Sequence, residues 1–223
     1  MAEIHDAETA TSLNVDDLRV AVARRGRRLE HLTIGWNAVE AIVSIAAGLY
    51  AGSIALIGFG LDSVIETTSG AALLWRLHLD DPERRERAEG IALRIVGICF
   101  LALAAYVAYD SAMSLYRREK PEESIPGMVI AALSLIAMPL LARAKRKVAA
   151  ALKSRALHAD SRQTDICAYL SGILLGGLLL NALLGWWWAD PASALVMTPI
   201  IAREGVLALR AKACCGCHGS GDF

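Results

Sequence analysis

Two carboxylates, Asp62 and Glu66, lie four residues apart in the apolar segment SIALIGFGLDSVIETTSGAALLW, and residues 51–75 carry no other charge. Burying one carboxylate near the middle of a lipid bilayer costs about 2.5–3.5 kcal/mol on insertion scales. On a helix, residues at this spacing lie about 40° apart, on one face. The pair therefore indicates a site for a cation, for protons or for both.

The alternative is that the two carboxylates form structural salt bridges, which requires buried basic partners. The candidates are Arg94, Arg162 and Arg203, in or beside apolar segments. Since we expect no Lys or Arg at mid-depth of any membrane span, we favour the cation or proton site.

The composition supplies helices that can position this pair. The chain has 223 residues, of which 55% are hydrophobic, with zero formal net charge and a mean hydropathy of +0.42. A membrane-spanning helix needs about 20 mainly apolar residues. We therefore expect an all-α polytopic membrane protein, a bundle of six transmembrane helices at residues 32–50, 53–77, 91–116, 125–141, 156–184 and 186–209.

Charge divides the chain into three parts. We expect a polar N-terminal tail at residues 1–30, the six-helix transmembrane domain at 31–209 and a Cys/His-rich tail at 210–223. Lys and Arg gather in the first tail and in the second-to-third and fourth-to-fifth connections. The positive-inside rule then places both termini in the cytoplasm. No cleavable signal peptide is visible, and we expect the bacterial inner membrane. Binding of anionic lipids is an alternative role for the basic regions.

Polar side chains recur at helical spacing in two other expected spans: Asn37 and Glu40 in the first, and Asp160, Gln163 and Cys167 in the fifth. Such side chains should face one another rather than lipid. Carboxylate and amide oxygens with a thiolate form a mixed donor set, which favours Zn²⁺ or Cd²⁺ over Mg²⁺. Alternatively, Cys167 packs as a small apolar side chain.

Three segments resemble the cation diffusion facilitators, a family of six-span divalent metal exporters. GSIALIGFGLDSVIE resembles the family's second span, where two ligands lie four residues apart. HADSRQTDICAYLSG resembles the start of the fifth span, where an Ala-Asp pair precedes an HxxxD motif, and WWWADPASAL resembles the Asp-Pro start of the sixth. The resemblance covers about residues 32–209. It implies a homodimeric transporter, not an enzyme, that exports metal in exchange for protons.

Aligning the Ala-Asp pairs places Gln163 and Cys167 at the positions of the family's HxxxD ligands. The resemblance thus implies a metal site of Asp62, Glu66, Gln163 and Cys167, flanked by Glu40, Asp160, Asn37 and Asp165. Another register would use Ser161 and Asp165. Because the motif QxxxC replaces HxxxD in this sequence, the resemblance does not settle which metal is transported. We expect Zn²⁺ as the transported ion, with Cd²⁺ or Co²⁺ as alternatives, no prosthetic group and no nucleic-acid partner.

The family usually carries a cytoplasmic metal-binding domain after the sixth span, whereas here only residues 210–223 follow, so we expect a short form. This tail contains four side chains that bind soft metals, and we expect them to capture metal: Cys214, Cys215, Cys217 and His218. An incidental Cys-rich end or a palmitoylation site is the alternative. For the whole chain, the rivals are a membrane metal sensor or scaffold without transport, and a plain channel.

Overall fold

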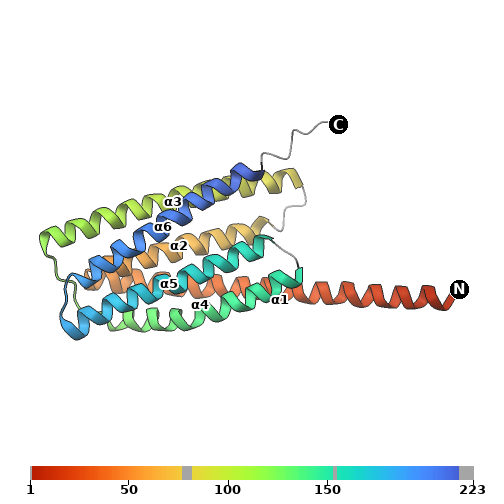
Figure 1. Cartoon of the computed structure of the whole chain (residues 1–223), viewed down its shortest axis with the longest axis horizontal. Helices are drawn as coiled ribbons and strands as arrows, with labels where there is room; N and C mark the ends of the chain where they lie inside the picture. Colours follow the sequence, from red (N-terminus) through yellow and green to blue (C-terminus); the bar gives the residue numbers. More distant parts are fainter. Residues whose placement is uncertain (1, 77–81, 153–154, 216–223) are drawn as a thin grey trace.

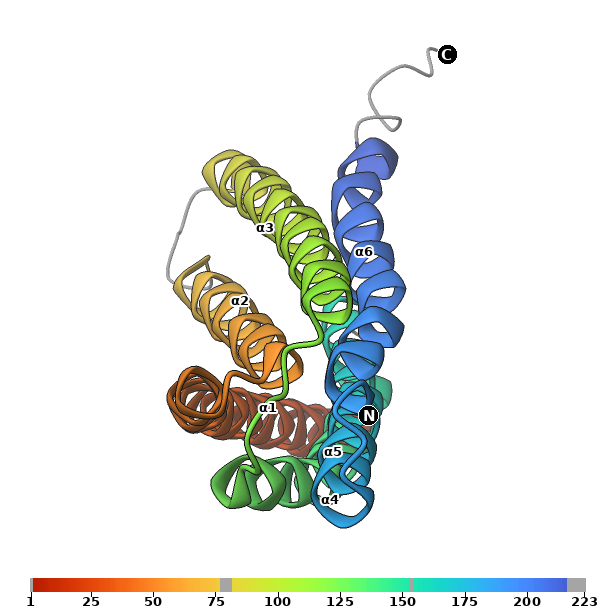
Figure 2. The same cartoon turned by 90° about the vertical axis from the view of Figure 1, so that its left-hand side faces the viewer.

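Six helices make up the described part of the chain. A computed structural model describes residues 2–76, 82–152 and 155–215, and no strand occurs among them. The helices are α1 (Ala2–Ala51), α2 (Ile54–Arg76), α3 (Pro82–Arg117), α4 (Ile125–Leu152), α5 (Arg155–Leu184) and α6 (Ala189–Cys215). They run side by side in a single bundle (Figure 1, Figure 2). The predicted all-α fold is confirmed.

Five segments of the described helices are long and apolar enough to cross a membrane: Arg24–Ala51, Gly90–Arg117, Ile125–Leu152, Asp160–Leu184 and Ala189–Arg210. The helix that carries Asp62 and Glu66, α2, is not among the five, but it lies alongside them in the bundle (Figure 1). The protein is thus an integral, polytopic membrane bundle of six helices.

Several helices are longer than the sequence predicted, among them α3, which begins at Pro82 rather than near residue 91. Helix α1 begins at Ala2 rather than near residue 32, and its first part projects beyond the bundle (Figure 1). Helix α4 continues to Leu152 rather than ending near residue 141. The added segments are rich in Ala, Leu, Arg and Lys, which favour helix. Pro139 lies inside α4 without ending it, as neighbouring helices permit in membrane proteins.

A close crossing sets α1 against α2. A Cβ atom on Gly60 would lie 2.7 Å from Cγ1 of Ile45, and one on Gly48 would lie 2.8 Å from Cγ1 of Ile57. Small residues at such points allow two backbones to approach closely. This crossing brings the polar stripe of α1 next to the carboxylates of α2.

The first residues of α2 are held by a carboxylate from α6. Asp190 is buried, and its Oδ2 accepts a 3.0 Å hydrogen bond from the backbone N–H of Ile54, while Ser53 donates to its Oδ1. A negative charge at a helix N-terminus is favourable, because the first N–H groups have no partner within the helix. The Asp-Pro motif therefore anchors the helix that carries Asp62 and Glu66.

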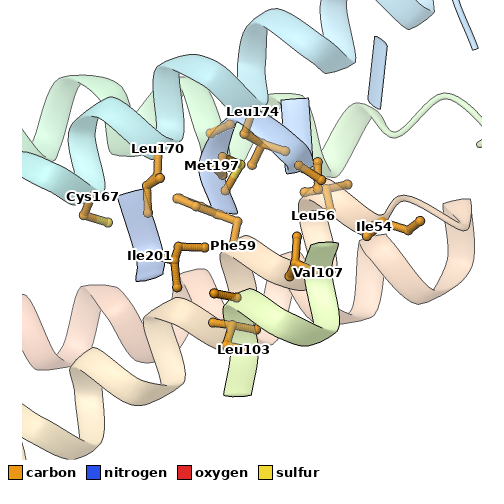
Figure 3. Packing of buried hydrophobic residues seen from close by; sticks show 14 of the residues in the cluster. Ile54, Leu56, Phe59, Leu103, Val107, Cys167, Leu170, Leu174, Met197 and Ile201 are labelled. Atoms are coloured by element: carbon orange, nitrogen blue, oxygen red, sulfur yellow. The ribbon is translucent and has the colours of Figure 1, made fainter. Parts of the chain in front are cut away.

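An apolar cluster fills the bundle beside the polar residues. It is contributed by α2, α3, α4, α5 and α6, and its members include Phe59, Leu103, Leu170 and Met197 (Figure 3). Cys167 lies at one end of this cluster, next to Leu170 (Figure 3). Helix α2 contacts α5 as well as α1, α3 and α6, so the helix that carries Asp62 and Glu66 lies against both helices that carry the other predicted polar stripes.

Candidate metal site

Asp62 is a buried carboxylate without a compensating partner in the described part of the chain. Its exposed fraction is 3%, and no described group donates a hydrogen bond to it or forms an ion pair with it. The charged neighbours of Asp62 include Glu40, Glu66 and Glu204, all acidic. A buried charge of this kind is costly unless a cation or a proton neutralises it.

Glu66 lies one turn along α2 and is bound to α1. The side-chain amide of Asn37 donates a 2.8 Å hydrogen bond from Nδ2 to Oε2 of Glu66. Asn37 is buried, and its Oδ1 has no hydrogen-bond partner in the described part of the chain. An acceptor oxygen therefore stands unused beside the two carboxylates.

Glu40 is the centre of a hydrogen-bond network that joins four helices. This carboxylate is 0% exposed. It accepts hydrogen bonds from Ser63 on α2 at 2.5 Å, from Ser134 on α4, from Trp36 on α1 at 3.2 Å and from the thiol of Cys167 on α5 at 3.5 Å. Charge-assisted bonds of this kind satisfy a buried carboxylate. Glu40 is thus solvated by protein donors, whereas Asp62 is not.

The predicted ligands of α5 are not gathered around Asp62 and Glu66. The thiol of Cys167 points to Glu40, and Gln163 is half-buried without a hydrogen bond to any described group. In the described ranges, no three side chains of His, Cys, Asp or Glu are arranged to hold a metal ion. The four-ligand set remains a prediction.

Asp160 has a partner that the sequence reading missed. The ammonium of Lys145 on α4 lies 2.6 Å from Oδ2 of Asp160 and 2.9 Å from Oε2 of Glu30 on α1. The sequence predicts that residue 145 belongs to the basic fourth-to-fifth connection, and this prediction is wrong, because Lys145 is buried within α4. Because Lys145 pairs with Glu30 and Asp160, its salt bridges do not involve Asp62 or Glu66.

The alternative register of α5 has its side chains engaged elsewhere. Asp165 forms an ion pair with Arg146 of α4, and the hydroxyl of Ser161 donates a 2.7 Å hydrogen bond to the carbonyl of His158. Both contacts are made away from Asp62 and Glu66. The choice between the two registers stays a prediction.

Glu204 on α6 is a further acidic neighbour that the sequence reading overlooked. Its Oε1 is buried without a hydrogen-bond partner among the described residues, and its charge acts on Asp62. Arg162 and Arg203 act on Glu204 with the opposite sign. A carboxylate inside the predicted sixth span was the signal that could have revealed it.

The predicted metal-capture tail falls mostly outside the structure. Cys214 and Cys215 belong to the last turn of α6. Cys217 and His218 lie outside the described residues. Metal capture by the tail stays a prediction.

Comparison with known proteins identifies the family. Residues 31–213 match the cation efflux transmembrane domain. The chain belongs to the cation efflux family. The resemblance seen in three segments of the sequence is therefore confirmed.

Individual relatives are distant. The chain is 27% identical to Transmembrane protein 163 of Xenopus laevis over 176 residues, and 22% identical to the cation-efflux pump FieF of Shewanella oneidensis over 169 residues. It is 26% identical to the uncharacterized transporter sll1263 of Synechocystis over 182 residues. These matches cover 78%, 73% and 78% of this chain, but only 63%, 57% and 58% of the relatives. The chain therefore spans less than two thirds of their length.

Proposed function

We propose that the protein exports a divalent transition-metal cation from the cytoplasm in exchange for protons, through a site between α2 and α5. The observation that carries this proposal is the state of Asp62, which is buried, has no described donor and has acidic neighbours. The match to a cation efflux domain and the similarity to a cation-efflux pump support it.

The local charge balance supports exchange. The charges of Glu40, Asp62 and Glu66 act on one another, whereas Lys145 is engaged by two other carboxylates. Either one divalent cation or two protons would neutralise Asp62 and Glu66. Because metal ligands must be deprotonated, the metal and the protons exclude one another. Protons arriving from outside therefore release the metal, and the metal arriving from the cytoplasm displaces the protons.

The proposed ligands are Asp62, Glu66, Gln163 and Cys167, and the free Oδ1 of Asn37 is a further oxygen beside Glu66. The thiol of Cys167 would lose its proton on binding metal, and Glu40, which already accepts its hydrogen bond, can take that proton. A thiolate favours soft and borderline ions, so we propose Zn²⁺, with Cd²⁺ or Co²⁺ as alternatives.

We place the protein in the bacterial inner membrane as a homodimer, with both termini in the cytoplasm. The support for this orientation is the exposed basic residues at the start of the apolar part of α1 and near the end of α4, among them Arg24, Arg28, Arg143 and Lys147. Such clusters mark the cytoplasmic side of a membrane protein. The homodimer rests on the family resemblance.

Liposomes that contain a metal-sensitive dye test this function. Wild-type protein should carry Zn²⁺ against its gradient when a proton gradient is imposed, and an Asp62→Asn, Glu66→Gln double variant should show only background flux. Asp110→Asn, a substitution on α3 outside the site, is the control and should transport normally. Metal binding without flux would favour the sensor or scaffold, and flux that ignores the proton gradient would favour a channel.

A further inference from the structure

A single buried ammonium joins three helices at one place in the bundle. The side chain of Lys145 is 1% exposed, and the side chains of its partners Glu30 and Asp160 are 6% and 19% exposed. The three residues come from α4, α1 and α5. The proposed site uses none of the three as a ligand, so this triad needs an explanation of its own.

The triad lies directly beside the proposed site. A Cβ atom on Gly70 of α2 would meet Oε1 of Glu30 at 2.8 Å, so Glu30 packs against α2 at that point. Gly70 follows Glu66 by four residues, about 6 Å along the same face of the helix. The charges of Lys145 and Asp160 also act on Glu66. The triad therefore occupies the next turn beyond the carboxylate pair.

The position of the triad along the helices shows at which end of the bundle it lies. Lys145 lies in the last two turns of α4, and Asp160 lies in the second turn of α5. This is the end of the bundle where α4 leads into α5 and where the exposed basic residues gather. It is the end that we have proposed to be cytoplasmic.

Buried ion pairs often add little stability compared with apolar residues of the same volume, but a broken one is costly. A bridge of this kind therefore has two distinct states, joined and separated, rather than a continuum. A divalent cation near Glu66 would repel the ammonium of Lys145. Arrival of metal and separation of the bridge are thus coupled.

We propose that Lys145 is a gate: its ammonium, held between Glu30 and Asp160, holds α1, α4 and α5 together and so closes access to Asp62 and Glu66 from the side of the α4–α5 connection. The direction of the gate rests on the proposed function. The bridge closes access to the site whether or not metal is transported. The gate can therefore be tested without measuring transport.

Cys167 is a native reporter for this gate, because it is a fully buried thiol among the proposed ligands. The test uses a variant in which Cys167 is the only thiol, obtained by replacing the other cysteines with Ser: Cys99, Cys214, Cys215 and Cys217. In vesicles of known orientation, a charged methanethiosulfonate is added to one side at a time. The Lys145→Met variant should react faster from the side of the α4–α5 connection, by about tenfold or more, since the closed state loses its bridge. Lys145→Arg should restore slow labelling.

Arg146→Met is the matched control. Arg146 pairs with Asp165 between the same two helices, but both side chains are partly exposed and α1 is not involved. Labelling of Cys167 should stay at the wild-type rate in this variant. An equal acceleration in Arg146→Met would overturn the gate.

Lys145→Met leaves two buried carboxylates unpaired, so a neutral variant is needed as well. Combining it with Glu30→Gln and Asp160→Asn removes all three charges and should still give fast labelling from the same side. Slow labelling of the neutral variant, or acceleration that is equal from both sides, would refute the gate. If the labelling rates agree with the prediction but the protein transports no metal, the gate proposal is supported and the proposed function is refuted.

Discussion

The thiol of Cys167 on α5 donates a 3.5 Å hydrogen bond to Oε1 of Glu40 on α1, and both groups are fully buried. A thiol that donates this bond carries its proton, so Cys167 enters the proposed cycle as a thiol with an acceptor already in place.

Replacing Cys167 with Ser should change the choice of metal more than the fold. A serine hydroxyl can still donate to Glu40, but an oxygen binds soft ions less well than a thiolate does. We expect the affinity for Cd²⁺ and Zn²⁺ to fall by about tenfold or more, with a smaller change for Mn²⁺. Calorimetric titrations of purified protein measure this, with the exposed Cys99→Ser as control. Equal weakening for every ion would place the thiol outside the ligand set.

Neutralising the carboxylates of the cluster should have opposite effects at two positions. Asp62→Asn removes the need to neutralise a buried carboxylate to which no described group donates a hydrogen bond, so the metal-free protein should become more stable. Glu40→Gln disrupts a carboxylate that four groups donate to, and should lower stability by about 1–3 kcal/mol. Thermal unfolding in detergent compares the two variants. If both shift the melting temperature in the same direction, the contrast drawn between Glu40 and Asp62 is mistaken.

Metal should stabilise the folded protein through Asp62 and Glu66. A ligand at a hundred times its dissociation constant adds about 2.7 kcal/mol to the unfolding free energy. We therefore expect Zn²⁺ to raise the melting temperature of wild type and to leave that of the Asp62→Asn, Glu66→Gln variant almost unchanged. A full metal-induced shift in the double variant would show that the metal binds elsewhere, and deletion of residues 214–223 would then reveal whether the tail is responsible.

The contact between Asp190 and the start of α2 should matter for both stability and the site. Asp190→Ala leaves the Ser53 hydroxyl and the Ile54 N–H without their acceptor, which should cost about 1–3 kcal/mol. Helix α2 would also lose its anchor, so metal affinity should fall. Thr198→Ala, on the same helix, removes only a bond to its own backbone and serves as the control. An Asp190→Ala protein with wild-type melting and metal affinity would contradict this role.

The sequence revealed what depends on local pattern. Apolar runs predicted the helices, and the spacing of Asp62 and Glu66 predicted one buried face. The polar stripe of α1 was also visible, and Asn37 does reach Glu66. These features follow from helical periodicity, which a single sequence contains.

Features that depend on packing between helices were missed. In the sequence, Lys145 is one of several basic residues in a predicted connection. Its burial is explained only by the ion pairs with carboxylates of α1 and α5. Likewise, nothing local marks Glu40 as the acceptor for donors that include Ser134, 94 positions away. Such contacts are set by how helices distant in sequence cross.

The central claim is that metal and protons compete for Asp62 and Glu66. The most direct measurement is the number of protons released when Zn²⁺ binds, obtained by calorimetry in buffers of different ionisation enthalpy. The account predicts that wild-type protein releases protons on binding Zn²⁺ and that the Asp62→Asn, Glu66→Gln variant loses this release together with the binding. Zn²⁺ binding without proton release, or release that is unchanged in the double variant, would contradict it.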